Sequence, residues 1–291
     1  MVALRKVVVP VAGLGTRFWP ATAVLPKEML PLVDRPAIEY TVDEALRAGL
    51  DDLLFITSRA KRAIEDHFDV PPDIERLASE KGIALTARPE ARFHFVRQNR
   101  PLGLGHAVGL AEAHVGGEPF AVMLPDDVLL GPPDCMTAMV RLAERTGRAV
   151  VAVRRVEPAQ VSAYGVIRPT GELERGVYEV GDLVEKPSPD RAPSNLAIVG
   201  RYVLPADTFR LLRETAPAVA GEIQLTDALR ALNRQRPMLA YHFPGRVFDT
   251  GSKLGFLQAT VELAMEHPQL GAEFAAYLAR RVEAAAPAYR A

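Results

Sequence analysis

The sequence predicts an α/β protein built on one sheet, mostly parallel in its first half and mixed in its second. Two observations lead to this fold class. Short apolar runs alternate with segments of helical spacing up to about residue 154, which is typical of βαβ units. Beyond that point Gly and Pro separate further strand-like runs, which indicates strands that complete the same sheet. The 291 residues, 48% hydrophobic and 24% charged, are enough for one domain with a sizeable core.

The first strand is predicted at 6–11, because this valine-rich run is apolar enough to be buried on both faces. The helix that follows is indicated by the spacing of Ile38, Val42 and Leu46, and Gly49 stands where a helix commonly ends. The same alternation predicts the other elements of the first half. Strands are expected at 52–57, 93–97, 120–124 and 149–154, and helices at 37–48, 59–68, 105–114 and 136–143.

The segment 70–89 interrupts this alternation, since it is richer in Pro and charge. One short surface helix near Ile74 and Leu77 is expected there, on an excursion that serves as a lid or a contact surface. The second half continues with strands and ends in helices. Strands are expected at 163–167 and 195–203, and helices at 225–232, 254–265 and 274–282.

The composition narrows the possible partners and ligands. A net charge of −1 provides no basic field for nucleic acid or an anionic membrane. The single cysteine, Cys135, excludes an internal disulfide and a cysteine cluster, so a metal would rest mainly on oxygen ligands. The six histidines show no spacing typical of a metal or catalytic site. Neither a signal peptide nor a run of about 18 apolar residues is present, so a soluble cytoplasmic protein is expected.

A glycine-rich turn, Ala12-Gly13-Leu14-Gly15, follows the first strand. In an open α/β sheet this places flexible backbone at the edge where ligands bind, and successive N–H groups can converge on phosphate oxygens. Two common glycine motifs are excluded by missing residues. A dinucleotide fingerprint requires a small residue where Phe18 stands, and a P-loop requires Gly-Lys-Ser/Thr.

Basic residues follow this turn at two points, Arg17 and Lys27. Arginine offers a planar fork of donors and lysine a compact charge, so the loop carries both kinds of phosphate ligand. On the motifs Val9–Arg17 and Pro26–Asp34 the chain resembles the bacterial UTP–glucose-1-phosphate uridylyltransferases, within the sugar-nucleotide pyrophosphorylase superfamily. The resemblance continues through nearly the whole chain, although Phe18-Trp19 is bulkier than expected for the family.

The resemblance implies a Rossmann-like three-layer αβα nucleotidyltransferase fold with a mixed, mostly parallel central sheet. It implies a single domain over 1–291, with a nucleotide-binding half (about 1–150), a sugar-phosphate half (about 151–250) and C-terminal helices (about 251–291). UTP and glucose 1-phosphate are the implied substrates and magnesium (Mg²⁺) the implied cofactor. A homodimer or homotetramer is implied too, but the 70–89 excursion looks shorter than in some members, which leaves the assembly open.

The site residues come from motifs that match the family. Nucleotide binding is expected from Ala12, Gly13, Gly15, Thr16, Arg17, Lys27, Glu28, Gln98 and Gly103, with Gln98 reading the uracil edge because an amide both donates and accepts. Asp126 and Asp249 correspond to the acidic metal positions, which suits an oxygen-loving Mg²⁺. Sugar-phosphate binding is expected from Gly165, Glu185, Lys186, Asn195 and Glu222, and the catalytic set is Arg17, Lys27, Asp126 and Lys186.

These roles predict in-line attack of a glucose 1-phosphate oxygen on the α-phosphorus of UTP, giving UDP-glucose and pyrophosphate. The sugar phosphate, with a second pKa of about 6, is mostly the dianion at neutral pH, so no general base is required. Lys186 would hold the sugar phosphate, while Arg17 and Lys27 would stabilise the departing pyrophosphate. Two alternatives remain: the same chemistry with dTTP or another hexose 1-phosphate, and a catalytically silent regulatory homologue.

Overall fold

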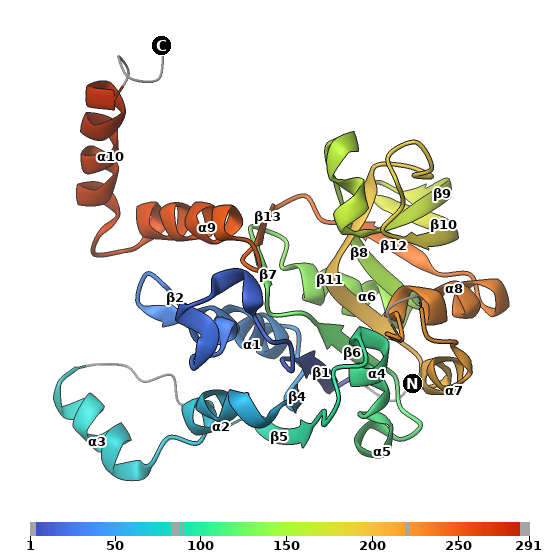
Figure 1. Cartoon of the computed structure of the whole chain (residues 1–291), viewed down its shortest axis with the longest axis horizontal. Coiled ribbons are helices and arrows are strands. Elements are labelled where there is room, and N and C mark those ends of the chain that lie inside the picture. Colours follow the sequence, from blue (N-terminus) through green and yellow to red (C-terminus); the bar gives the residue numbers. More distant parts are fainter. Residues whose placement is uncertain (1–3, 83–87, 89, 219–220, 286–291) are drawn as a thin grey trace.

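A computed structural model describes residues 4–82, 88, 90–218 and 221–285, and the fold is given for these residues. Within them one sheet of nine strands runs through the body in the order β5-β4-β1-β6-β11-β8-β12-β10-β9 (Figure 1). Its strands are β1 (Lys6–Pro10), β4 (Asp52–Thr57), β5 (Arg92–Arg97), β6 (Phe120–Met123), β8 (Val150–Arg155), β9 (Gly165–Glu174), β10 (Val177–Glu185), β11 (Leu196–Leu204) and β12 (Leu239–His242).

The direction of the strands changes partway across this sheet. The neighbours β5, β4, β1 and β6 are all parallel. The next strand, β11, lies antiparallel between β6 and β8, and β12 is parallel to β8. Beyond β12 the sheet ends in the antiparallel strands β10 and β9. The mixed central sheet predicted from the sequence is therefore confirmed.

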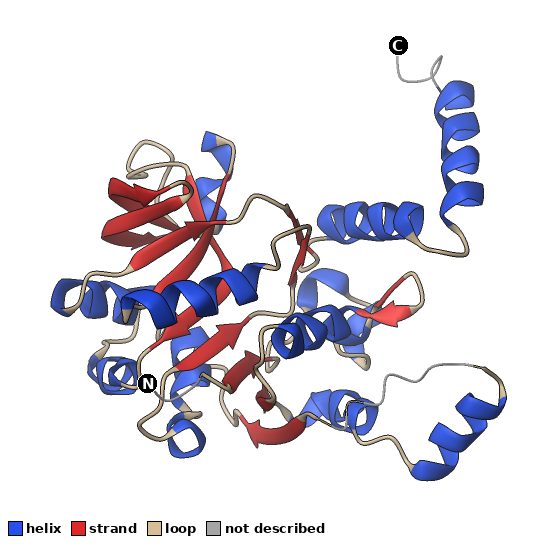
Figure 2. Ribbon diagram, turned by 180° about the vertical axis from the view of Figure 1, so that it is seen from behind, coloured by secondary structure: helices blue, strands red, loops and turns tan. Residues whose placement is uncertain are grey.

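Helices cover both faces of the sheet and make the three predicted layers (Figure 2). Alternate apolar side chains of β1 face opposite sides of the sheet. Val8 belongs to the core cluster that includes residues of α4, α7 and α8, whereas Val7 and Val9 belong to the cluster that includes residues of α1, α2 and α6. The helices of the described residues are α1 (Ala37–Arg47), α2 (Arg62–Phe68), α3 (Pro72–Glu80), α4 (Leu104–Gly109), α5 (Glu112–Val115), α6 (Cys135–Thr146), α7 (Asp207–Glu214), α8 (Leu225–Gln235), α9 (Lys253–Glu266) and α10 (Gly271–Ala285).

Several short elements lie outside the main sheet. Two strand pairs are the hairpin β2–β3 and the antiparallel pair β7–β13, which brings the chain after residue 245 back beside residue 127. Their bounds are β2 (Pro31–Leu32), β3 (Arg35–Pro36), β7 (Asp127–Leu130) and β13 (Arg246–Asp249), and the 3₁₀ turns are η1 (Thr16–Phe18), η2 (Ala21–Ala23), η3 (Lys27–Met29), η4 (Arg59–Lys61) and η5 (Pro158–Ala163).

The predicted elements of the first half are confirmed, apart from one helix. The helix expected at 105–114 is divided into α4 and α5, because Gly109, a poor residue for a helix interior, ends the first piece. The expected surface helix of the 70–89 segment is α3, while residues 83–87 and 89 lie outside the described residues. Both α3 and α10 project from the body (Figure 1). Among the described residues, no helix is both long and apolar enough to cross a bilayer.

Candidate active site

Two neighbouring parallel strands, β1 and β6, deliver the glycine turn and a pair of carboxylates to one edge of the sheet. The turn begins at Val11, whose N–H donates to the Ile56 carbonyl at 2.8 Å. The carboxylates Asp126 and Asp127 follow β6 after Leu124 and Pro125. Since the carboxyl ends of parallel strands lie at the same edge, segments more than 100 residues apart in the sequence meet there.

The glycine turn leaves its backbone open. Gly15 is in the left-handed region, with φ 67° and ψ 25°, and its carbonyl accepts from the Thr22 hydroxyl at 2.7 Å. Gly13 is exposed, and a Cβ added there would meet nothing within 4 Å. The Arg17 guanidinium is exposed and makes no hydrogen bond or ion pair with the described part of the chain. This edge therefore offers free backbone and a free cation for an anion.

Lys27 and Asp126 form an ion pair in this site, with Nζ 2.6 Å from Oδ2. Burial alone would lower the pKa of Lys27, but the charges of Asp126 and Glu28 outweigh it and raise that pKa. Burial acts in the opposite sense on Asp126, whose pKa the Lys27 ammonium nevertheless lowers. Both groups are thus held in their charged forms.

A second carboxylate, Asp249, reaches the same place from the far end of the chain. The pairing of β7 with β13 sets Asp249 opposite Asp127, and the Thr250 N–H and hydroxyl both donate to the Asp126 carbonyl, at 2.7 and 2.9 Å. A Cβ built on Gly251 would lie 2.9 Å from Asp249 Oδ1 and 3.2 Å from Asp126 Oδ2. The two carboxylates therefore converge on the space beside Gly251, which fits a hard divalent cation with oxygen ligands.

Asp127 differs from its neighbour Asp126 because no cation within the described part of the chain forms an ion pair with it. Its Oδ2 accepts from the Gly200 N–H at 2.9 Å. Burial and, next, the charge of Asp126 raise the pKa of Asp127 to about 6. The adjacent carboxylates thus titrate in different ranges.

Arg201 of β11, which was not predicted from the sequence, holds this turn in place. Its guanidinium is 1% exposed and forms two hydrogen bonds to Glu44 Oε2, at 2.7 and 2.9 Å. It also donates to the Leu124 and Asp127 carbonyls, both at 2.8 Å, on either side of Asp126. A signal was present, because an arginine in the otherwise apolar run 196–204 must be paired if that strand is buried.

A cavity of about 140 Å³ lies beside the carboxylates and contains two residues predicted to bind the sugar phosphate. Gly165 and Glu185 line it, and Thr226, which the sequence analysis did not single out, donates to Glu185 Oε2 at 2.6 Å. Lys186 follows with a positive φ of 44°, unusual outside glycine, and its side chain is 58% exposed with Nζ 3.6 Å from Glu185 Oε1. The exposed ammonium of Lys186 and the enclosed carboxylate of Glu185 thus lie side by side at the end of β10.

Three other predicted residues gather around the turn before α4. Gln98 is buried, and its amide donates to the Gly103 carbonyl at 3.3 Å and contacts His106 Nδ1 at 2.8 Å. Gly103 has φ 94° and packs so closely on Glu222 that a Cβ there would lie 2.9 Å from the Glu222 Cβ. The turn therefore requires glycine at position 103.

The remaining predicted residues lie apart from that group. Ala12 is buried and Thr16 exposed within the first turn. The Glu28 carboxylate is paired with Lys61 Nζ at 2.7 Å in a buried ion pair, which turns it away from solvent. Asn195 borders a different hollow, where its Oδ1 accepts from Arg155 at 3.2 Å.

A profile of the nucleotidyl transferase family matches residues 6–266. A UTP–glucose-1-phosphate uridylyltransferase of Bacillus subtilis is 46% identical over 281 residues, which is 94% of each chain. One of Streptococcus pneumoniae is 45% identical, over 94% of this chain and 95% of that relative. Among solved structures, a UDP-glucose pyrophosphorylase complexed with UDP-glucose has a TM-score of 0.83 at 42% identity, covering 91% of this chain and 100% of that one. A UTP-bound enzyme from Acinetobacter baumannii has a TM-score of 0.86 at 40% identity, covering 94% and 98%.

Proposed function

This chain belongs to the nucleotidyl transferase family, and we infer that it transfers the uridylyl group of UTP to glucose 1-phosphate, forming UDP-glucose and pyrophosphate. The observation that carries this function is the convergence of Lys27, Asp126 and Asp249 beside an open glycine turn. Relatives at 45–46% identity that carry the name of this enzyme favour a working catalyst over a silent homologue.

Members of this family act with a divalent metal ion, and we propose Mg²⁺ here, held by Asp126 and Asp249. The two carboxylates flank a space that only glycine leaves open, and carboxylate oxygens are the ligands this ion prefers. When bound, the ion neutralises charge on the reacting phosphates. The ammonium of Lys27, 2.6 Å from Asp126, would keep that carboxylate ionised when no metal is bound.

The residue roles follow from charge and position. An oxygen of the glucose 1-phosphate dianion would attack the α-phosphorus of UTP in line, so that the bond to the bridging α,β-oxygen breaks and pyrophosphate leaves. The exposed guanidinium of Arg17 and the ammonium of Lys27 would neutralise the leaving pyrophosphate, and Lys186 would hold the phosphate of the sugar. Glu185, oriented by Thr226, would accept hydrogen bonds from sugar hydroxyls in the cavity.

These roles are tested with Lys27→Ala and Asp126→Ala, which should each lower kcat by about 10²-fold or more because each removes charge stabilisation that acts in the transition state. Lys81→Ala and Asp73→Ala, exposed side chains at the ends of α3, are matched controls and should keep wild-type kcat. Near-normal turnover of Lys27→Ala or Asp126→Ala would contradict the assignment.

Substrate choice is tested with a pyrophosphate-release assay that pairs UTP or dTTP with glucose 1-phosphate and with other hexose 1-phosphates. UTP with glucose 1-phosphate should give the highest kcat/KM. A higher value for dTTP or for another sugar would replace the proposed substrate while keeping the chemistry. Absence of release with every pair would favour the silent homologue.

We also propose that the protein works in the cytoplasm as a homodimer or homotetramer, without nucleic-acid or membrane partners. The net charge of −1 supports the absence of a polyanionic partner. Large apolar side chains are exposed along α9 and α10 and in the turn between them, and would be covered in an assembly: Leu254, Leu257, Met265, Leu270, Tyr277 and Val282. Light scattering after size exclusion should give two or four times the chain mass of 31.7 kDa, and a single-chain mass would refute the assembly.

A further inference from the structure

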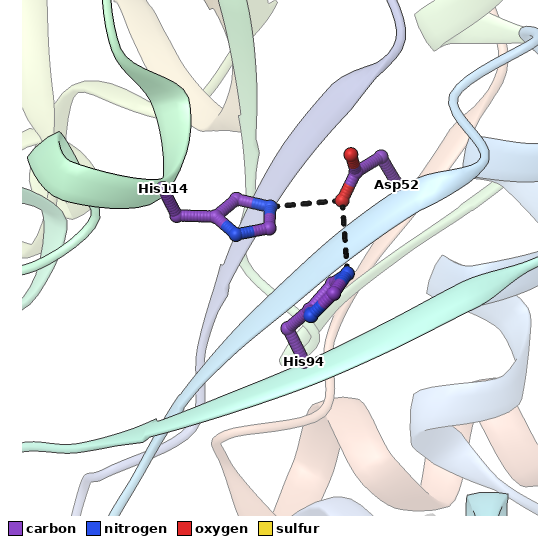
Figure 3. Close-up of side chains that lie close together, drawn as sticks. All are labelled: Asp52, His94 and His114. Atoms are coloured by element: carbon purple, nitrogen blue, oxygen red, sulfur yellow. Dashed lines mark hydrogen bonds and ion pairs between the residues drawn. The ribbon is translucent and has the colours of Figure 1, made fainter.

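A cluster of Asp52, His94 and His114 lies at the opposite edge of the sheet from the proposed active site. Asp52 is the first residue of β4, His94 lies in β5 and His114 lies in α5 (Figure 3). In the parallel register Asp52 stands beside Lys6, the first residue of β1, whereas the glycine turn follows the other end of β1. At about 3.3 Å per residue, the five steps from Lys6 to Val11 separate the two edges by about 16 Å.

The three side chains direct ligand atoms at one point. Figure 3 shows both imidazoles meeting the same carboxylate oxygen, with His114 Nε2 2.8 Å and His94 Nε2 3.5 Å from Asp52 Oδ1. All three ligand atoms lie within 4.8 Å of one another, and no other group of three His, Cys, Asp or Glu side chains is as close among the described residues. Zinc bound tetrahedrally by nitrogen and oxygen at about 2.0–2.1 Å places its ligand atoms about 3.3 Å apart. The two distances to Asp52 Oδ1, 2.8 and 3.5 Å, lie on either side of that value.

The surroundings hold these side chains in place and leave a way in. Asp52 is 8% exposed, and its other oxygen, Oδ2, is 3.2 Å from the Arg92 guanidinium, which leaves Oδ1 directed at the imidazoles. Lys6 Nζ donates to the His114 and Val115 carbonyls, which ties α5 to β1. The side chain of His94 is 45% exposed, so an ion could enter from solvent and complete its coordination with water.

The charges around the cluster balance, so that they do not exclude a cation. Arg92 pairs with Asp52, and Lys6 pairs with Glu118 at 3.0 Å. The two histidines carry no charge in their neutral form, and the neutral form is the one that binds metal. The contact of Arg92 with the second oxygen of Asp52 is the kind of outer-shell contact that fixes the orientation of a metal ligand.

We propose that Asp52, His94 and His114 bind Zn²⁺ or a similar divalent transition-metal ion. This ion links β4, β5 and α5 at the edge of the sheet away from the nucleotide site. The ligand set, two imidazole nitrogens and one carboxylate oxygen, suits Zn²⁺ and discriminates against Mg²⁺ and Ca²⁺, which prefer oxygen ligands throughout. This site is separate from the carboxylates Asp126 and Asp249 and does not depend on the proposed function.

The experiment is a calorimetric titration of the full chain with Zn²⁺, after removal of metal by chelation and in an excess of Mg²⁺ that occupies oxygen-only sites. Wild type should bind one Zn²⁺ per chain. His94→Gln should bind at least about 100-fold more weakly, since one of three ligands is lost. This variant retains the hydrogen bond between Asp52 and His114, so its fold is not at risk. Circular dichroism and turnover with saturating Mg²⁺ should match wild type.

Two matched variants identify the ligands. His67→Gln also removes a histidine paired with a carboxylate, Glu39 at 2.9 Å, and should retain wild-type zinc affinity. Asp126→Ala removes the proposed active-site ligand and should retain it as well. Co²⁺ in place of Zn²⁺ should give visible absorption of a four-coordinate site in wild type, and His94→Gln should lose it. Equal zinc affinity in wild type and His94→Gln, or loss of binding in Asp126→Ala alone, would overturn the proposal.

Discussion

Replacing Arg201 by Met should show whether this arginine positions the 124–127 turn or only stabilises the protein. The substitution keeps an unbranched side chain but removes the guanidinium that donates to the Leu124 and Asp127 carbonyls. It also leaves the Glu44 carboxylate, 3% exposed, without its cation. Both a stability loss and an activity loss are therefore expected.

The size of the stability loss follows from the burial of the ion pair. Removing one partner of a buried pair costs about 3–5 kcal/mol, since the other charge remains desolvated. An unfolding entropy of about 2.1 cal/mol/K per residue gives about 0.6 kcal/mol/K for the 291 residues. Arg201→Met should therefore lower the melting temperature by about 5–8 °C. A displacement of Asp126 by about 1 Å should lower kcat by about 10²-fold.

A double substitution separates these two effects. Arg201→Met combined with Glu44→Leu replaces both charges by apolar groups, which is often neutral for stability. Most of the lost melting temperature should return, but kcat should stay low, because the carbonyls on either side of Asp126 still lack their donors. The assay is the initial rate of pyrophosphate release, measured at least 15 °C below the transition, alongside a thermal melt.

Arg148 provides a matched control at the other edge of the sheet. It too donates to two carbonyls, of Pro237 and Met238, and pairs with a carboxylate, Glu179 at 2.9 Å. Arg148→Met should lower the melting temperature without lowering kcat. Recovery of kcat together with melting temperature in the double variant would refute the positioning role of Arg201.

Three further changes test single contacts of the site. Gly251→Ala fills the space between the carboxylates and should lower kcat about 10²-fold, whereas Gly171→Ala, which meets nothing within 4 Å, should not; equal rates would show that this space is not used. Folding raises the pKa of Asp127 to about 6, so the folded state binds a proton there more tightly than the unfolded state does. The stability that this proton binding provides is lost as the pH rises through 6. Asp127→Asn should thus raise the melting temperature more at pH 8 than at pH 5, and equal shifts would contradict this titration. Thr226→Val removes the hydrogen bond to Glu185 and should raise KM for glucose 1-phosphate about fivefold with KM for UTP unchanged, while Thr226→Ser should resemble wild type. The same KM in both Thr226 variants would indicate that the hydroxyl is dispensable.

The elements that the sequence predicted are those whose side chains carry a local pattern. β1 and β4 are runs of apolar residues, and α1 shows one buried face at helical spacing. By contrast, β7 and β13 have four residues each, too few for a period to appear, and they exist as strands because they pair across 116 or more positions. Such pairing depends on the whole fold and leaves no mark on either segment alone. The proposed division of the single domain into two halves and C-terminal helices stays a prediction.

The candidate site was predictable where its residues come in contiguous motifs. Lys27 and Asp126 lie in such motifs, and the structure brings their charged atoms together. Contacts between residues outside motifs were not predictable, as for Glu44 and Arg201, which are separated by 157 positions. The histidines illustrate the same limit, because residues on a strand and a separate helix have no characteristic spacing. The lack of a typical spacing among the histidines gave no indication that His94 and His114 come together at Asp52, where three elements meet.

The two consecutive carboxylates after β6 show how the fold assigns different chemistry to identical side chains. Asp126 lies in the turn before β7, whereas Asp127 is the first residue of that strand, and the two side chains meet different partners. Asp126 meets Lys27, and its pKa falls, whereas Asp127 meets the backbone N–H of Gly200 and its pKa rises to about 6. The charge of Asp126 opposes ionisation of Asp127, so Asp126, next to Lys27, ionises at lower pH than its neighbour. As the pH rises, negative charge therefore appears first on the carboxylate that converges with Asp249 beside Gly251, which is where a divalent cation would need it.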